Sequence, residues 1–243
     1  MNRTGVLAAF DFDHTICDNN TDVVARKLLP EWKIPEDVKD LYKSSGWIAY
    51  MNKIFELLHE NSIDARTIEN AIVNIPAVRG IETLLESLSK NGHEIIIISD
   101  SNSIFIDRWL KSKKLEHLVS RVFTNPAWYD DDGKMRVGMY HTQHTCKLSS
   151  INLCKGQILM DYVRERRVQG KCFEKIVYVG DGQNDFCPLM RLLETDLACA
   201  RKCYALVSIL DSIPSNESTK AQILLWNDAT DLYCNLKQIL DLH

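Results

Sequence analysis

The chain has 243 residues, of which 45% are hydrophobic, and a formal net charge of −4. This length and composition suffice for one large domain, or for a core with a small inserted domain. The charge is modest and the Lys and Arg residues form no block, which argues against nucleic acid or an anionic membrane as a partner. We therefore expect a globular protein that binds a small molecule.

The sequence also bears on location. It has no run of about 18 apolar residues, and it begins without the basic region, apolar stretch and cleavage site of a secretory signal. Its eight cysteines are irregularly spaced in a chain long enough to fold without disulfides, which favours reduced thiols. We therefore expect a cytoplasmic protein, and the sequence leaves its oligomeric state open.

The first predicted strand, residues 6–10, is followed by two carboxylates at Asp11 and Asp13. Side chains alternate across a strand, so the two acids share one side if the chain stays extended, while Phe12 faces the core. Two such charges about 4 Å apart repel by roughly 4 kcal/mol at an effective dielectric constant of about 20. The pair therefore requires a cation or a shared proton, and it predicts a divalent metal site.

Four more short apolar runs, rich in β-branched residues, follow along the chain. They are residues 94–98, 121–124, 175–179 and 196–199. Several are apolar at consecutive positions, as strands buried on both faces require, and helical patterns such as that of residues 81–88 separate them. The alternation predicts an α/β fold with a doubly wound, mostly parallel, Rossmann-like sheet.

Two insertions are expected in this fold. About 80 residues separate the first two strands, more than one crossover helix needs, so we expect a helical cap at residues 17–76 and an α/β core of residues 1–16 plus 77–243. The second insertion, residues 124–138, has Asp132-Gly133 between two apolar segments and predicts a hairpin, with an irregular loop as the alternative.

One helical face of the expected cap carries aromatic and aliphatic side chains. They are Trp47, Tyr50, Met51, Ile54 and Leu58. Such a face either packs against the rest of the protein or holds an aromatic ring or a quaternary ammonium group of a substrate.

Polar clusters stand at the carboxyl ends of three predicted strands, where ligand sites of doubly wound sheets lie. They are Asp11 with Asp13, Ser99 with Asp100, and Gly180-Asp181. Together with Lys155 and the rest of residues 180–185, these clusters resemble, in order, the four motifs of the haloacid dehalogenase-like phosphatases. Any one of them alone is also compatible with an ordinary loop or surface residue.

The resemblance implies phosphoryl transfer from a phosphomonoester. Asp11 would be the nucleophile and form an aspartyl-phosphate, while Asp13 would protonate the departing alcohol and later deprotonate the attacking water. Asp13 would then need a raised pKa at the start of the cycle. Ser99 would donate a hydrogen bond to a phosphate oxygen, and Lys155 would offset negative charge on the phosphate and the nucleophile.

The family pattern further implies Mg²⁺ as the cofactor. Its protein ligands would be the carboxylates of Asp11 and Asp181 and the backbone carbonyl of Asp13, with Asp185 behind them or on a metal-bound water. An alternative for Asp185 is capping of a helix that we expect to continue through Leu193.

The likeness covers the whole length and extends to the branch of phosphoethanolamine/phosphocholine and pyridoxal-phosphate phosphatases, notably at residues 98–107, 123–127 and 152–156. It implies pyridoxal 5′-phosphate as the substrate, with phosphoethanolamine or phosphocholine as the alternative. By position, Asp22 and Asp100 would bind the non-phosphate end, because Lys155 and a metal already serve the phosphate. Helix capping is the alternative for both acids.

Other function classes are less compatible with the sequence. A dehalogenase shares the nucleophilic aspartate but does not need Asp13. An aspartyl-phosphate receiver domain would not need the cap, Asp13 or residues 180–185. Transfer of the phosphoryl group to a second metabolite stays open.

The proximity of His141, His144, Cys146 and Cys154 suggests a zinc site. Their spacing is not a familiar zinc pattern, and Ser149 stands where the resembling family tends to have a further cysteine. We interpret the segment as a polar loop leading into the helix of Lys155.

Overall fold

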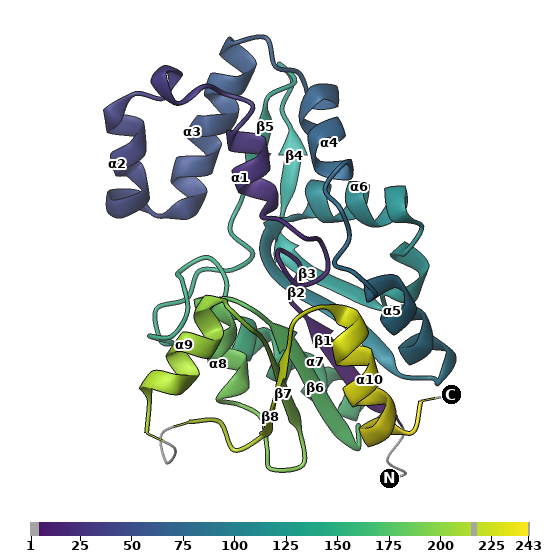
Figure 1. Ribbon diagram of the computed structural model, residues 1–243. Helices are drawn as coiled ribbons and strands as arrows, with labels where there is room; N and C mark the ends of the chain where they lie inside the picture. Colours follow the sequence, from purple (N-terminus) through teal and green to yellow (C-terminus); the bar gives the residue numbers. More distant parts are fainter. Residues whose placement is uncertain (1–4, 215–217, 243) are drawn as a thin grey trace.

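The computed structural model describes residues 5–214 and 218–242 (Figure 1). In chain order its elements are β1 (Val6–Phe10), α1 (Thr21–Arg26), η1 (Glu31–Lys33), α2 (Glu36–Ser45), α3 (Trp47–Glu60), α4 (Ala65–Val73), α5 (Ile81–Lys90), β2 (Glu94–Asn102), α6 (Ser103–Lys113), η2 (Glu116–Leu118), β3 (Arg121–Asn125), β4 (Ala127–Tyr129), β5 (Met135–Val137), α7 (Lys155–Val168), β6 (Lys175–Gly180), η3 (Gln183–Asp185), α8 (Phe186–Leu189), β7 (Leu197–Arg201), α9 (Ala205–Ser212), β8 (Gln222–Trp226) and α10 (Ala229–Leu240), where η denotes a 3₁₀ helix. Among these described residues, each helix is too short or too polar to cross a lipid bilayer.

The central sheet has six parallel strands in the order β3-β2-β1-β6-β7-β8. The direction of winding reverses at β1, which pairs with β2 on one side and β6 on the other. In such sheets the ligand crevice lies outside the carboxyl ends of the strands at this reversal. The predicted α/β fold with a doubly wound parallel sheet is confirmed.

Both faces of the sheet are covered, which explains why its strands are apolar at consecutive positions. In β1, Val6, Ala8 and Phe10 pack in one hydrophobic cluster, and Leu7 and Ala9 pack in the other. Helices α5, α6 and α10 contribute to the first cluster, while α7, α8 and α9 contribute to the second. A strand with two buried faces has no solvent side, so it needs no alternation of polar residues.

Most predicted strands are present with small shifts of their ends, but two details differ. The strand expected at residues 196–199 begins at Leu197, because the Asp196 carboxylate instead accepts hydrogen bonds from the backbone N–H groups of Ile176 and Leu193 at 2.8 Å each. The same turn contradicts the helix expected through Leu193, since α8 ends at Leu189. The sequence analysis did not anticipate β8.

Four α-helices, α1 to α4, lie between β1 and α5, and Figure 1 shows them at one end of the molecule together with β4 and β5. The predicted hairpin is confirmed, since β4 and β5 pair antiparallel. It packs on α3, where the Asn52 amide bonds both the N–H and the C=O of Val137 at 2.9 and 2.8 Å.

The helical stripe of α3 is a packing face for most of its length. Tyr50, Met51, Ile54 and Leu58 are buried. Trp47, at the start of α3, is only partly buried and points its indole N–H at Asp22.

Candidate active site

The acidic residues named from the sequence gather where three neighbouring strands end. Asp11 follows β1, Ser99 and Asp100 lie in the last part of β2, and Asp181 follows β6. A cavity of 140 Å³ at this edge is lined by Asp11, Asp13, Ser99, Asp100 and Asp181, among others. The predicted convergence of the three polar clusters is therefore present in the tertiary structure.

Lys155 is the first residue of α7 and is fully buried. Its ammonium group lies 2.8 Å from Asp11 Oδ1 and 2.7 Å from Asp185 Oδ1. Burial alone lowers the pKa of a lysine, but the charges of Asp11 and Asp185 outweigh it, so the pKa of Lys155 is raised above its ordinary value. Lys155 therefore stays charged and bridges the end of β1 to the loop after β6.

The Asp185 carboxylate is enclosed by donors. Oδ1 accepts from Lys155 Nζ and from the Tyr178 hydroxyl at 2.7 and 2.8 Å. Oδ2 accepts from the backbone N–H groups of Asp181 and Gly182 at 3.0 and 2.9 Å. With two donors on each oxygen, Asp185 is committed to holding the loop and Lys155 in place.

These contacts also decide which helix Asp185 caps. Its carboxylate accepts a hydrogen bond from the backbone N–H of Gly182 at the start of the 3₁₀ helix η3. It makes no side-chain capping bond to α8, the helix for which capping was the alternative. The close approach depends on Gly180, because a Cβ there would lie 2.4 Å from Asp185 Cγ. The glycine before Asp181 is thus required by packing.

Asp13 is anchored by the start of α1. Its two carboxylate oxygens accept from the backbone N–H and the hydroxyl of Thr21 at 3.1 and 3.2 Å. Burial, with smaller contributions from the charges of Asp22 and Asp11, raises the pKa of Asp13 to about 8. This shift has the direction that a general acid requires.

The neighbouring acids are perturbed in the same way. Burial raises the pKa of Asp11 to about 7, although the attraction of Lys155 opposes the shift. Burial and then the charges of Asp11 and Asp185 raise the pKa of Asp181 to about 8. Without a cation these carboxyl groups hold protons near neutral pH, which agrees with the argument from their crowding in the sequence.

The donor set fits a hard divalent cation. One carboxylate oxygen from each of Asp11, Asp181 and Asp185 lies within 4.8 Å of the others. Mg²⁺ and Ca²⁺ both take oxygen ligands, and Mg²⁺ typically uses one or two carboxylates together with water and phosphate oxygens. Because Asp185 already accepts four hydrogen bonds, Asp11 and Asp181 are the carboxylates available to such an ion. The Thr15 hydroxyl donates to Asp181 Oδ1 at 3.3 Å and orients it.

The comparisons with known proteins agree with this site. A family model described as Putative Phosphatase matches residues 6–240. The chain belongs to this phosphatase family. The pyridoxal phosphate phosphatase PHOSPHO2 of Bos taurus is 36% identical over 238 residues, which cover 97% of this chain and 98% of that protein. The phosphoethanolamine/phosphocholine phosphatase of Homo sapiens is 34% identical over 238 residues, covering 96% and 89%.

Solved structures share the fold of this phosphatase. A phosphoserine phosphatase described as a phospho-aspartyl intermediate analogue has a TM-score of 0.61 and 22% identity, with 97% of this chain and 99% of that chain covered. A haloacid dehalogenase family hydrolase from Salmonella enterica has a TM-score of 0.64 and 17% identity, covering 98% and 72%. These likenesses confirm the fold that the resemblance to haloacid dehalogenase-like phosphatases implied.

Asp22 and Asp100 both lie beside the acids of the site in this phosphatase, since Asp100 lines the cavity and the charge of Asp22 raises the pKa of Asp13. Asp22 Oδ2 accepts from the Trp47 indole N–H at 2.7 Å, and burial raises the pKa of Asp22 to about 6. Asp100 accepts from the side-chain amides of Asn152 and Asn184 at 3.0 and 2.8 Å. Both acids are thus held in fixed orientations by neutral donors.

The capping alternatives for these two acids are wrong. Asn20 caps α1 by accepting from Val23 N, and Asn102 caps α6 by accepting from Phe105 N. Asp22 lies within the first turn of α1, and Asp100 is still in β2. The asparagine directly before each helix performs the cap and leaves both carboxylates for other contacts.

The sequence analysis assigned no role to several residues that shape the site. Asn152 and Asn184 stand in segments quoted for the resemblance, yet their bonds to Asp100 become evident only in three dimensions. Arg201, at the end of β7, donates to the carbonyl oxygen of His14 and lies 2.9 Å from Asp18, so it braces the loop after Asp13. A charged residue closing an apolar strand beside the predicted site is the signal that could have identified it.

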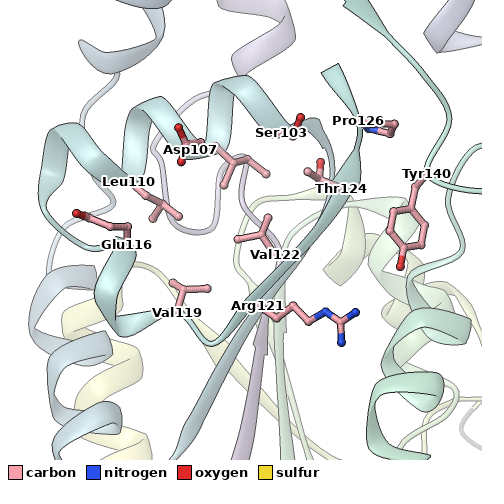
Figure 2. Close-up of a pocket in the computed structure, with 11 residues that line it drawn as sticks. Ser103, Asp107, Leu110, Glu116, Val119, Arg121, Val122, Thr124, Pro126 and Tyr140 are labelled. Atoms are coloured by element: carbon pink, nitrogen blue, oxygen red, sulfur yellow. The ribbon is translucent and has the colours of Figure 1, made fainter. Parts of the chain in front are cut away.

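A larger cavity, of 510 Å³, lies between α6 and β3 and is lined mainly by their residues and the η2 region (Figure 2). Ser103, Leu110, Val122, Thr124 and Tyr140 are among its lining residues. None of the predicted site residues lines it, and it holds no cluster of acids. Candidate site residues therefore line the smaller cavity at the strand ends and not this one.

Proposed function

We propose that the protein is a Mg²⁺-dependent phosphatase that hydrolyses pyridoxal 5′-phosphate through an aspartyl-phosphate on Asp11. The observation that carries this proposal is the position of Asp11 at the reversal of the sheet, 2.8 Å from buried Lys155 and beside Asp181. The 36% identity over 97% of the chain to a pyridoxal phosphate phosphatase supports the choice of substrate.

In the proposed mechanism the Asp11 carboxylate attacks phosphorus. The Lys155 ammonium group offsets the negative charges of this carboxylate and of the phosphate. Asp13 gives its proton to the departing alcohol oxygen, for which its raised pKa suits it. Asp13 then takes a proton from the water that hydrolyses the aspartyl-phosphate, so its proton is restored. Ser99 Oγ accepts a hydrogen bond from the N–H of Ser101 at 3.2 Å. In the proposed mechanism the Ser99 hydroxyl donates its own hydrogen bond to a phosphate oxygen.

We propose the carboxylates of Asp11 and Asp181 and the backbone carbonyl of Asp13 as the protein ligands of Mg²⁺. When bound, the ion neutralises negative charge on the carboxylates and the phosphate. Asp185 stays behind this set, because its oxygens already hold Lys155, Tyr178 and two backbone N–H groups.

We also propose that residues 17–76 act as a cap on a core of residues 1–16 plus 77–243. Asp22 and Trp47 come from this segment, whereas Asp100 comes from the core. Asp22 and Asp100 would contact the pyridine nitrogen or a hydroxyl of the substrate from two sides. Helix α1 also anchors Asp13 through Thr21, so the cap would link recognition to the general acid.

Phosphoethanolamine or phosphocholine is the second candidate substrate. The cavity of 140 Å³ is below the roughly 300–1,000 Å³ typical of drug-sized ligands, which favours a short leaving group. Two carboxylates at the non-phosphate end suit an ammonium group. The 34% identical human relative is named for these substrates.

The test is hydrolysis of a set of phosphorylated metabolites with Mg²⁺ and with EDTA, by wild type and by Asp11→Asn. We expect pyridoxal 5′-phosphate to have the highest kcat/KM, EDTA to abolish turnover, and the variant to be inactive while it keeps the wild-type circular dichroism spectrum. Asp107→Asn, an exposed acid on α6, is the matched control and should retain activity.

Other outcomes of this test would point elsewhere. Activity of Asp11→Asn at the wild-type level would remove Asp11 from the nucleophile role. A phosphorylated protein that persists for minutes would indicate a receiver domain, and phosphate appearing on an added alcohol would indicate transfer. A preference for phosphoethanolamine would select the second candidate.

A further inference from the structure

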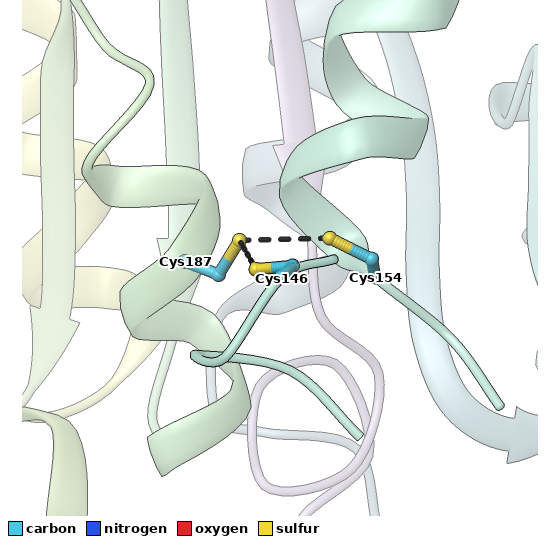
Figure 3. A group of neighbouring side chains, drawn as sticks. All are labelled: Cys146, Cys154 and Cys187. Atoms are coloured by element: carbon cyan, nitrogen blue, oxygen red, sulfur yellow. Dashed lines mark hydrogen bonds between the residues drawn. The ribbon is translucent and has the colours of Figure 1, made fainter. Parts of the chain in front are cut away.

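Three thiols meet outside the acidic site, on the face of the sheet covered by α7 and α8 (Figure 3). Cys146 belongs to the loop before α7, Cys154 is the residue directly before α7, and Cys187 is in α8. The Cys187 sulfur lies 3.4 Å from that of Cys146 and 3.7 Å from that of Cys154, and all three lie within 4.8 Å of one another. Cys154 and Cys187 are fully buried, and Cys146 is partly exposed.

This spacing is that of sulfur ligands around one metal ion. Zinc binds thiolates at about 2.3 Å in tetrahedral geometry, which places sulfur atoms about 3.8 Å apart. The sulfur–sulfur distances of 3.4 and 3.7 Å in the structure fall close to that value. We propose that Cys146, Cys154 and Cys187 form a zinc-binding site, separate from the acidic site at the strand ends.

The fourth position of a tetrahedral ion would be filled from the adjoining cavity. This cavity has a volume of 250 Å³ and is lined by Cys146, Cys154 and Gln157, among others, so water can reach the ion. His141 is excluded as the fourth ligand, because its Nε2 accepts the N–H of Cys154 at 2.9 Å. The proposed zinc ligands are thus three cysteines and a water molecule, in place of the two histidines and two cysteines that the sequence suggested.

The charges around the cluster also suit this occupant. When three thiols bind Zn²⁺, three S–H bonds break, three Zn–S bonds form, and three protons pass to the solvent. The product has a net charge of −1. Arg191 and Arg164 line the same cavity and bring positive charge near it, although Arg164 also pairs with Asp161. Ser149 Oγ, 3.3 Å from Cys154 Sγ and 3.5 Å from Cys146 Sγ, is placed to donate a hydrogen bond to a thiolate.

The site would join the loop before α7, the start of α7 and helix α8. Cys154 directly precedes Lys155, and Cys187 follows Asp185 by two residues. Zinc would therefore fasten the loop before α7 to α7, which begins with Lys155, and to α8, which directly follows Asp185. Loss of the zinc should lower the melting temperature of the protein more than it lowers its phosphatase activity.

The test is metal content. Reduced full-length protein is loaded with Zn²⁺ in the presence of excess Mg²⁺, which occupies the acidic site, and is then gel-filtered. We expect about one zinc per chain, released by titration with a mercurial thiol reagent, as for a structural thiolate site. Cd²⁺ in place of Zn²⁺ should give a thiolate-to-metal charge-transfer band, which oxygen ligands do not produce.

The variants make the result specific. Cys187→Ala and Cys146→Ala should lose the retained zinc and the cadmium band, and zinc should no longer raise their melting temperatures. Cys234→Ala, at an exposed cysteine of α10, is the matched control and should behave as wild type. Asp11→Asn should also retain its zinc. Wild type without retained zinc and without a cadmium band, or zinc retained equally by Cys187→Ala and Cys234→Ala, would overturn the proposal. The cadmium measurement on wild type decides the matter even if a variant does not fold.

Discussion

Replacing Lys155 by methionine tests the central electrostatic arrangement. The side chain is fully buried, and it lies 2.8 Å from Asp11 and 2.7 Å from Asp185. Methionine fills much of the same volume but leaves two buried carboxylates without their shared cation. Removing one partner of a buried ion pair costs about 3–5 kcal/mol in the free energy of unfolding. For a domain of this size, each kcal/mol lowers Tm by about 2–4 °C, so we expect a fall of about 6–20 °C.

The pH dependence of this loss follows from the same contacts. Lys155 lowers the pKa of Asp11, so in Lys155→Met the pKa of Asp11 rises above its wild-type value of about 7. The native variant then binds more protons than the unfolded chain, and its stability decreases as pH rises. The difference in unfolding free energy between wild type and variant should therefore grow from acidic to alkaline pH.

The assay is urea unfolding of metal-free protein at several pH values. Lys111→Met is the matched control, because it removes an exposed ion pair with Asp107, worth about 0.2–1 kcal/mol. The double variant Lys155→Met/Asp185→Asn should be more stable than the sum of the single effects predicts, since it removes one of the two repelling charges. Equal losses for Lys155→Met and Lys111→Met, or strictly additive effects in the double variant, would refute the reasoning.

Three further predictions concern the acids. Asp13→Asn should slow hydrolysis of alkyl phosphates more than that of p-nitrophenyl phosphate, whose leaving group needs no proton; equal losses in kcat would contradict its acid role. Burial raises the pKa of Asp13 and Asp181 from 3.8 to about 8, so the metal-free native state binds more protons than the unfolded chain. The unfolding free energy of metal-free protein should therefore fall between about pH 4 and pH 8. An unfolding free energy that does not change over this range would count against these shifts. Asp100→Ala should alter the kcat/KM ratio of pyridoxal 5′-phosphate to phosphoethanolamine more than kcat/KM for p-nitrophenyl phosphate, whereas parallel losses would make Asp100 structural.

Features that depend on local pattern could be predicted from the sequence. Consecutive apolar residues in β1 and β2 indicate strands buried on both faces, and carboxylates directly after β1 and β6 must lie at one edge once those strands run parallel. The Asp-Gly turn predicts the hairpin of β4 and β5 with an irregular loop as the alternative, and their antiparallel pairing confirms the hairpin. These inferences need only chain periodicity and the common direction of the strands.

Contacts between residues distant in the chain became evident only in three dimensions. Asn20 and Asn102 cap helices α1 and α6, where the sequence had left Asp22 and Asp100 as alternatives. Each cap depends on the backbone angles at one residue, which local sequence does not specify. The helix of α8 stops at Leu189 because Asp196, seven residues on, bonds the intervening turn.

The same holds for side chains far apart in the chain. Lys155 reaches Asp11 across 144 positions, and Cys187 joins Cys146 across 41. No periodic pattern encodes such pairs, since each is formed by the packing of α7 and α8 on the sheet. The sequence therefore indicates the candidate site residues, whereas packing selected the partners that hold them and brought the three thiols together.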